Sequence, residues 1–514
     1  MKTPNIIRGK RYESGIALLI AILALLLVTA VALSLVLSTG TESALAGNYR
    51  VSTNAYYAAS AGLEEARSRL LPSNPNSISP NLTALMTTVG PVTYLPTNQV
   101  LYLTNPGPGE PAGAGLLGIY PDTQYGGEFP TPPYAAAPTK TYVNSVWTGA
   151  ANTGPLYKWV RINAATKSSL GIDVDNTGIG PIIPANASTP LYYDAANVPA
   201  SMIVPPAGFP ATAPAASAKQ AYEVTALAVL PTGSRKIVQY VVAPVTYGLN
   251  FPGALTLGGS VGNFKGANSN NYRINGQDGS GSVAVPGCAP NPADVRAAVD
   301  VSNENAGNGQ SNQNYVTGSL PRPDHYTGAG GTPSVVADNP TGPLSSPSSV
   351  DQLLQQIQQN ADAVIPNPPN PPGYNNSGTT YNFGGPGWPP NMSADNPQVV
   401  YVDGSFDLGP NTGYGILVVT GNFIYHGNSG WNGIILVIGD GTTTYVGSGG
   451  GNGEFDGAIL AATTRDANGN QLANFGTVNF DINGGGGNGI YYSSCWINKV
   501  QNPPKYQVLS FREF

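Results

Sequence analysis

The sequence predicts an α+β protein in which a long N-terminal helix packs on an antiparallel sheet and a mainly β region follows. Three features predict this fold. An uninterrupted apolar segment at residues 16–37 continues as a helical pattern to residue 70. Alternating apolar and polar residues between 157 and 242 are typical of strands. From residue 251 onward, short aliphatic runs alternate with glycine-rich turns.

The first element is the apolar segment Ile16–Leu37, which follows a basic leader at residues 1–15. As a helix it would span about 33 Å, at about 1.5 Å per residue, and the hydrocarbon core of a bilayer is about 30 Å thick. The segment contains no charged residue that would oppose insertion. Because the leader is basic, the positive-inside rule places the N-terminus in the cytoplasm and the bulk of the chain across the membrane.

The helical pattern continues through residues 38–70, which contain no proline. Eight positions with alternating spacings of four and three form one mostly apolar stripe, namely Leu45, Tyr49, Ser52, Tyr56, Ala59, Leu63, Ala66 and Leu70. We therefore expect one helix over residues 16–70, with its first half in lipid and its second half against a soluble domain. A simple membrane anchor with a helical stalk is the alternative.

Residues 71–250 are predicted to form a domain with long loops around a small antiparallel sheet. The strand candidates are Tyr157–Ile162, Tyr222–Leu230 and Lys236–Val242, and Pro231–Ser234 predicts a hairpin between the last two. Alternate residues of the second candidate share one face, which is expected to pack on the helix stripe: Tyr222, Val224, Ala226, Ala228 and Leu230.

Residues 251–514 are predicted to form a glycine-rich β domain. Its clearest strand candidates are Val399–Val402, Gly415–Val419, Gly433–Val437, Gly457–Ala461 and Gly476–Asp481. Recurrence at roughly twenty residues, with glycine- and asparagine-rich turns between strands, is typical of a β-solenoid. A β-sandwich is the alternative.

A helical insertion is expected within this domain, at about residues 277–398. Pro292–Val299 begins with a proline, which suits a first helical turn. Ser349–Val364 carries an apolar stripe, and Pro366 ends it. The second helix is expected to lie across a face of the β region or to cap its end.

Two motifs after the apolar segment, AGNYR at residues 46–50 and AASAGLEEAR at residues 58–67, resemble the N-terminal region of PilX-like minor type IV pilins. The glycine-rich region, with its closing YYSSCWI, resembles the C-terminal part of large proteins of this type less specifically. The resemblance implies a prepilin leader at residues 1–15, cleaved by prepilin peptidase between Gly15 and Ile16. It further implies a pilin helix over residues 16–70 on a pilin-like sheet, and assembly with other pilins.

The resemblance also implies a location. Before assembly the chain would cross the inner membrane once, in contact with its lipid, with its bulk in the periplasm. After assembly it would lie in the pilus at the cell surface.

One position departs from the pattern of major pilins, which place a glutamate at the fifth residue of the mature chain. If cleavage follows Gly15, that position holds Ile20. A glutamate in lipid is costly unless it is paired, so a subunit with no partner beneath that site is better without one. Isoleucine therefore suits an initiating or terminal subunit, and it equally suits an unprocessed anchor.

The expected function is that of a minor pilin that helps to initiate or assemble the filament and displays its C-terminal domain at the tip or surface. That domain could bind surface glycans or partner pilins. The alternatives are a tip pseudopilin of a type II secretion system and a membrane-anchored polysaccharide-binding or polysaccharide-degrading β-solenoid. With 22 basic and 28 acidic residues and no basic stripe, the chain is not expected to bind nucleic acid.

Catalytic and metal motifs are sparse. The two histidines, His325 and His426, lie in no catalytic or metal-binding pattern, so neither enzymatic activity nor a cofactor is expected. The two cysteines, Cys288 and Cys495, could form a disulfide in an oxidising compartment, and two buried free thiols are the alternative.

Calcium binding is a weaker alternative at two clusters, one with Asp173 and Asp175 and one beginning at Asp466. Both alternate oxygen donors as calcium loops do, but neither has the bidentate glutamate at position twelve. Asp/Asn/Gly turns bond to their own backbone without a metal, so no metal site is predicted.

Overall fold

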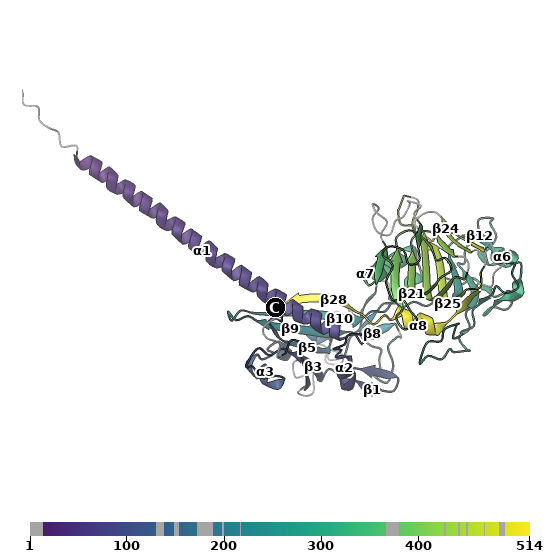
Figure 1. Ribbon diagram of the computed structural model, residues 1–514, viewed down its shortest axis with the longest axis horizontal. Coiled ribbons are helices and arrows are strands. Elements are labelled where there is room, and N and C mark those ends of the chain that lie inside the picture. Colours follow the sequence, from purple (N-terminus) through teal and green to yellow (C-terminus); the bar gives the residue numbers. More distant parts are fainter. Residues whose placement is uncertain are drawn as a thin grey trace, which may run out of the picture.

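The computed structural model describes residues 14–129, 138–148, 154–171, 189–197, 200–215, 217–365, 380–425, 428–439, 443–448, 451–466, 468–482 and 489–514. A long helix projects from a sheet domain, and a larger, mostly β region lies on the far side of that domain from the helix's free end (Figure 1). The expected α+β content, the long apolar N-terminal helix and the mostly β second region are confirmed.

Helix α1 runs without interruption from Ser14 to Arg69. Its apolar half is rich in leucine and alanine, which favour helix, and threonine hydroxyls bond back to the helix backbone. The Thr29 hydroxyl, for example, donates to the Leu25 carbonyl at 2.9 Å. The helix ends two residues before Leu71, whose position before Pro72 disfavours helical backbone.

The first domain is built on a six-stranded sheet with the order β28-β10-β9-β5-β3-β4. All neighbouring strands are antiparallel except β3 and β4, which are parallel. The strands are β3 (Gln99–Thr104), β4 (Thr139–Asn144), β5 (Tyr157–Ala164), β9 (Tyr222–Val229), β10 (Arg235–Pro244) and β28 (Tyr506–Glu513). The three strands expected from sequence are β5, β9 and β10, and the hairpin between β9 and β10 is confirmed.

Shorter elements cover this sheet and its edges. A two-stranded ribbon pairs β1 (Thr87–Val89) with β2 (Val92–Tyr94), and a three-stranded sheet has the order β7-β6-β8. The remaining elements are α2 (Ser79–Leu85), α3 (Ala114–Ile119), α4 (Tyr125–Glu128), α5 (Lys167–Leu170), β6 (Tyr192–Asp194), β7 (Ser201–Ile203) and β8 (Ala218–Gln220).

Only the last part of α1 packs on the sheet. Ala59, Leu63, Ala66 and Leu70 are fully buried, in one cluster with Tyr222, Val224, Ala226 and Ala228 of β9. The expected contact is therefore confirmed for these residues, but Leu230 lies outside the cluster. Leu45 and Tyr49 are 72% and 75% exposed, so the expectation that they pack is wrong. A helix of 56 residues is about 84 Å long, whereas a strand of ten residues covers only about 33 Å.

The last strand overturns the expected division of the chain, in which residues 251–514 form one domain. β28 pairs with β10 at the edge of the first sheet, so the second region is inserted between these two strands. The two connections bond to each other, because the Val245 N–H donates to the Lys505 carbonyl at 2.8 Å and the Tyr247 N–H to the Gln501 carbonyl at 3.1 Å. The second region is therefore attached to the first at two adjacent points.

In the second region, successive strands after α7 alternate between two sheets whose strands are all parallel. One sheet contains β17 (Ala363–Ile365), β19 (Gln398–Val402), β21 (Thr412–Val419), β23 (Gly430–Gly439), β25 (Glu454–Thr463) and β27 (Gly489–Tyr492). The other contains β12 (Val261–Lys265), β18 (Thr380–Asn382), β20 (Ser405–Asp407), β22 (Phe423–Tyr425), β24 (Thr443–Ser448) and β26 (Thr477–Ile482). Aliphatic and aromatic side chains of both sheets form one buried cluster.

The expected helical insertion is partly strand. Pro292–Val299 does not form the expected helix, because Ala297–Val301 is strand β14, buried between β11 (Gly253–Gly258) and β16 (Val335–Val336). Parallel pairing on both sides decides the conformation of AAVDV, whose local pattern is equally compatible with a helix. The other elements here are β13 (Ile274–Asn275), α6 (Asn312–Gly318), η1 (Pro323–His325), β15 (Tyr326–Thr327) and η2 (Gly342–Leu344).

The second expected helix is confirmed as α7, Pro347–Gln359, with the Ser346 hydroxyl capping its N-terminus. Its apolar residues Val350, Leu353 and Ile357 are buried in the cluster of the second region. The helix is shorter than expected, since Ala363–Ile365 forms β17 at the edge of the sheet. A last helix, α8 (Ser494–Gln501), packs on β21, β23 and β25.

Three glycines stack in register across β21, β23 and β25: Gly415, Gly433 and Gly457. Their φ angles are +128°, +135° and +143°, a region that only glycine adopts easily. A Cβ on Gly433 would also lie 2.1 Å from the Gly415 carbonyl oxygen and 3.2 Å from Val500 of α8. The glycines therefore allow these strands to bend at one level and α8 to approach them.

Replacing Gly433 by alanine should lower the free energy of unfolding of the second region by about 3 kcal/mol or more, from backbone strain and from the clash with the neighbouring strand. Thermal unfolding followed by circular dichroism measures the loss. Gly318→Ala is the matched control, because a Cβ there meets open space. Equal unfolding temperatures for the two variants would contradict the glycine argument.

Candidate functional site

The most unusual surface of the molecule is the apolar half of α1. Fifteen aliphatic side chains from Ile16 to Leu37 are more than half exposed, and no other part of the described chain packs on them. Ile20 itself is 62% exposed, and no carboxylate lies in this half of the helix. The helix is long and apolar enough to cross a membrane.

The sequence-predicted cleavage position lies at the start of this helix. Gly15 and Ile16 belong to its first turn, and the Ile16 side chain is exposed. Residues 1–13 of the predicted leader lie outside the described residues. The bond between Gly15 and Ile16 therefore lies in the part of α1 that is remote from the sheet domain.

The AASAGLEEAR motif is the part of α1 that docks on the sheet. Its glycine, Gly62, faces Tyr157 and Val160 of β5, and a Cβ there would lie 2.8 Å from Cγ of Tyr157. Ala59 and Ala66 are the small residues one turn on either side, and both are fully buried. Small side chains let a helix backbone approach closely, so the motif sets the distance between helix and sheet.

Glu65 also stabilises the contact between α1 and the sheet. Its carboxylate accepts hydrogen bonds from the Tyr157 hydroxyl at 2.7 Å and the Ser145 hydroxyl at 2.9 Å, and it pairs with Arg69 at 3.1 Å. Burial, and after it the Glu65 carboxylate, raise the pKa of Tyr157, so the hydroxyl remains a donor. The glutamate therefore ties α1 to β5 and to the loop after β4, a structural role within the motif.

The two cysteines are joined. Cys288 and Cys495 form a disulfide with their Cα atoms 5.8 Å apart. Cys495 lies in the first turn of α8, where the neighbouring Ser494 N–H donates to Asp278 at 2.7 Å and the Trp496 indole N–H donates to the Val283 carbonyl at 2.8 Å. The bridge therefore belongs to a set of contacts that hold the 278–288 loop on α8.

The calcium and histidine candidates do not assemble into a site. Asp466 is partly exposed and accepts hydrogen bonds from the Asn470 side chain and from the Asn470 and Asn468 backbone, which lower the pKa of its carboxyl. Asp173, Asp175 and His426 lie outside the described residues. The buried ring of His325 has its Nδ1 2.8 Å from the Tyr272 carbonyl oxygen. Among the described residues, no three acidic, histidine or cysteine side chains are grouped to hold a metal.

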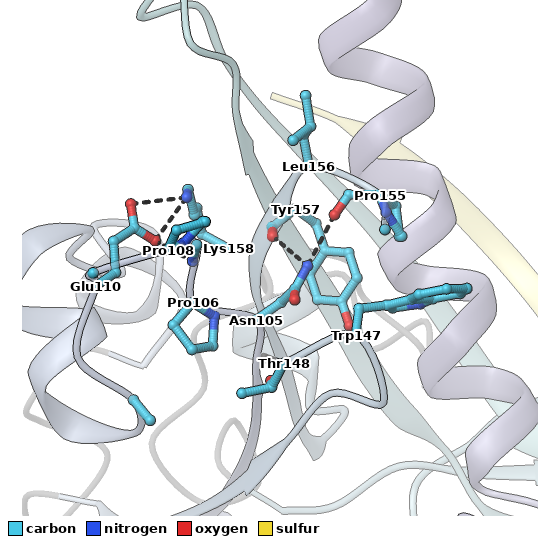
Figure 2. A pocket seen from close by; sticks show the side chains of 14 residues that line it. Asn105, Pro106, Pro108, Glu110, Trp147, Thr148, Pro155, Leu156, Tyr157 and Lys158 are labelled. Carbon is cyan, nitrogen blue, oxygen red and sulfur yellow. Dashed lines mark hydrogen bonds and ion pairs between the residues drawn. The ribbon is translucent and has the colours of Figure 1, made fainter. Parts of the chain in front are cut away.

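A cleft of about 640 Å³ opens beside β5, between the loop after β3 and the loops that flank Tyr157 (Figure 2). Its polar groups are bonded to one another. The Asn105 amide donates to the Pro155 and Tyr157 carbonyls, and the Lys158 ammonium lies 2.8 Å from Glu110. Burial would raise the pKa of Glu110, but the hydrogen bonds from Lys158, Tyr120 and Gly107 lower it. The charged groups of the cleft, Lys158 and Glu110, are therefore already paired with each other.

A buried charged cluster on the other face of the sheet was not expected from the sequence. Arg161 of β5 is fully buried among Asp122, Glu128 and Glu223. A signal was available, because Arg161 and Glu223 are charges inside mostly apolar strand sequences. Sequence spacing could not show that both point away from α1 toward the same loop.

Comparisons of the chain with protein-family models, with curated proteins and with solved structures find no match. The function is therefore inferred from the residues described above. Of these, the exposed apolar half of α1 and its docked second half form the candidate functional site.

Replacing Gly62 by leucine should lower the free energy of unfolding of the first domain by about 3 kcal/mol, since the larger side chain must displace Tyr157 or lift the helix. Gly47→Leu is the control in the same helix, because a Cβ there meets open space, and its effect should stay within about 0.5 kcal/mol. Both are measured by thermal unfolding of the full chain in detergent. A Gly62 variant as stable as the Gly47 variant would contradict the docking account.

Proposed function

We propose that the chain is a PilX-like minor subunit of a type IV pilus, which takes part in filament initiation or assembly and displays the second region at the tip or surface. The observation that supports this proposal best is the division of α1. One unbroken helix has an exposed apolar half and a half docked on a sheet through small residues. A helix of this kind can leave a bilayer and pack among similar helices without refolding its domain.

The docked motif strengthens the argument. Gly62, Ala59 and Ala66 belong to the segment that resembles the pilin family, and they are the residues that let the helix lie close to β5 and β9. An anchor that only crosses the membrane would not require its helix to continue into the domain and to be held close to the sheet. In this proposal the partners of the helix are inner-membrane lipid, prepilin peptidase and then other pilins.

Ile20 supports a position at the end of the filament. Its exposed apolar side chain offers no carboxylate to the N-terminal amine of a neighbouring subunit. An unpaired carboxylate in lipid is costly, so a subunit without one fits at a position where no pilin lies beneath Ile20. The tip pseudopilin of a type II secretion system shares this chemistry and is the second candidate.

For the second region we propose a β-solenoid. Successive strands alternate between two all-parallel sheets, and equivalent positions of successive rungs, such as Gly415, Gly433 and Gly457, are in register, which supports this architecture over a sandwich. Its double attachment between β10 and β28 would hold it firmly on the pilin-like domain. Surface glycans or other pilins are the ligands that we propose for it, in a structural rather than an enzymatic role.

Processing tests the proposal. In cells that contain prepilin peptidase, the mature chain should begin at Ile16, and in cells that lack it the fifteen-residue leader should remain. Gly15→Leu should keep the leader in both strains, because the enzyme is expected to act after glycine. N-terminal sequencing and intact mass measure each form.

Gly40→Leu is the control for this experiment, since it lies in the same helix with open space around it and should be processed normally. Identical N-termini in the two strains would sink the pilin proposal and favour a permanent anchor. A chain that is cleaved by the peptidase but remains in a complex with components of a secretion system would favour the pseudopilin.

A further inference from the structure

The second face of the first sheet is covered by a segment that we call the arm, residues 105–129, which contains α3 and α4. Leu117 of the arm packs on Tyr102 of β3, Trp159 of β5 and Leu227 of β9. The Trp159 indole N–H also donates to the Tyr120 carbonyl at 2.8 Å. The arm is therefore joined to the sheet by one apolar cluster and, beyond it, by the charged cluster around Arg161.

The charged cluster has an excess of carboxylates. The Arg161 guanidinium pairs with Asp122 of the arm at 2.8 Å, with Glu223 of β9 at 2.9 Å, and with Glu128 of α4. The Arg161 and Glu223 side chains are fully buried, and those of Asp122 and Glu128 are nearly so. One cation among three carboxylates leaves two negative charges in a medium that stabilises charge poorly.

The hydrogen bonds of the cluster also lack a donor. The Gln239 Nε2 lies 2.9 Å from Glu128 Oε1, 2.7 Å from Glu223 Oε1 and 3.0 Å from the Thr225 hydroxyl, yet it carries only two hydrogens. Among the described residues, neither Glu223 Oε2 nor Gln239 Oε1 has a hydrogen-bond partner, although both are buried. The Glu128 and Glu223 carboxylates share two donors, the Arg161 Nη2 group and the Gln239 Nε2 group, so they are neighbours, and a single proton between them would supply the missing donor.

The other groups that face Glu128 do not supply that proton. Tyr102 of β3 donates its hydroxyl to Asp122 at 3.0 Å, and Tyr125 of α4 stacks on Phe129. Ser168 of α5 donates to the backbone carbonyl of Glu128 and not to its carboxyl group. Lys167 of α5, which packs against α4, is also buried, and it has interactions of its own.

We propose that Glu128 and Glu223 share one proton, and that this acid pair is a pH-sensitive latch that holds the arm on the sheet. With the proton present, Glu128 and Glu223 bond to each other, and the cluster around Arg161 carries one net negative charge instead of two. When the proton is lost, two adjacent carboxylates repel each other in a buried site. The arm then separates from the sheet, beginning at the end that contains α4. Departure exposes the sheet face around Trp159 and opens one wall of the cleft in Figure 2.

The direction of the pH dependence follows from burial. Burial, and after it the neighbouring Glu223 carboxylate, raise the pKa of Glu128 well above its ordinary value of 4.5. The docked arm therefore keeps a proton that the free arm loses. Docking is complete below the ordinary pKa of a glutamate and weakens as the pH rises from there through the raised pKa.

Hydrogen exchange of the full chain in detergent tests the latch. The readout is the protection of amides in residues 114–129, corrected for intrinsic exchange, with β23 as the internal reference. In the wild type, protection of the arm relative to β23 should fall about tenfold or more between pH 6 and pH 9, since each unit of pKa shift corresponds to a factor of ten. In Glu128→Gln, which is neutral at both pH values, it should change less than about threefold.

Asp122→Asn is the matched control, because it removes a carboxylate from the same cluster but leaves the acid pair, and it should keep the wild-type pH dependence. If Glu128→Gln lowers the amide protection of β23, the variant is not folded normally, and Glu223→Gln is then used in its place. A wild-type arm whose protection is independent of pH would overturn the proposal, as would a Glu128→Gln arm with the wild-type dependence. Release of the arm by a chelator at pH 6 would also overturn it, since a bound cation would then be the missing partner.

Discussion

The close contact between the second half of α1 and the first sheet is the interaction on which the rest of the structure depends. Gly62 lets the helix backbone approach Tyr157, and Glu65 then bonds to the Tyr157 hydroxyl from the same side. Because the helix is fixed there and remains unbroken, its apolar half must project beyond the domain into solvent, lipid or other helices. The apolar half of α1 is therefore exposed because the second half is fixed on the sheet and the helix does not bend back.

The sheet that receives the helix is completed from the far end of the chain. β28 forms its edge beside β10, so the second region is an insertion within the first domain and not an appendage to it. Two adjacent connections, bonded to each other through Val245 and Lys505, carry this region. A load on the second region would reach α1 through two neighbouring strands of one sheet, which suits a domain displayed on a filament.

Local patterns in the sequence predicted the elements that are long or strongly periodic: α1, the β9–β10 hairpin, α7 and the recurring strands β19, β21, β23, β25 and β26. They failed where long-range pairing decides the outcome. AAVDV became β14 because strands lie on both sides of it, and β28 joined a sheet whose other strands end more than 260 residues earlier. The partners of Arg161 were hidden for the same reason, since Asp122, Glu128 and Glu223 meet it only in three dimensions. The pairing of Cys288 with Cys495 likewise needed their Cα distance.

The most direct test of the central claim is the location of the processed chain in cells. Surface filaments are sheared from cells with and without prepilin peptidase, and the chain is detected by immunoblot in the filament and inner-membrane fractions. The account predicts that the chain appears in sheared filaments only when the peptidase is present. A chain that stays in the inner membrane of peptidase-positive cells and never enters the filament fraction would contradict it.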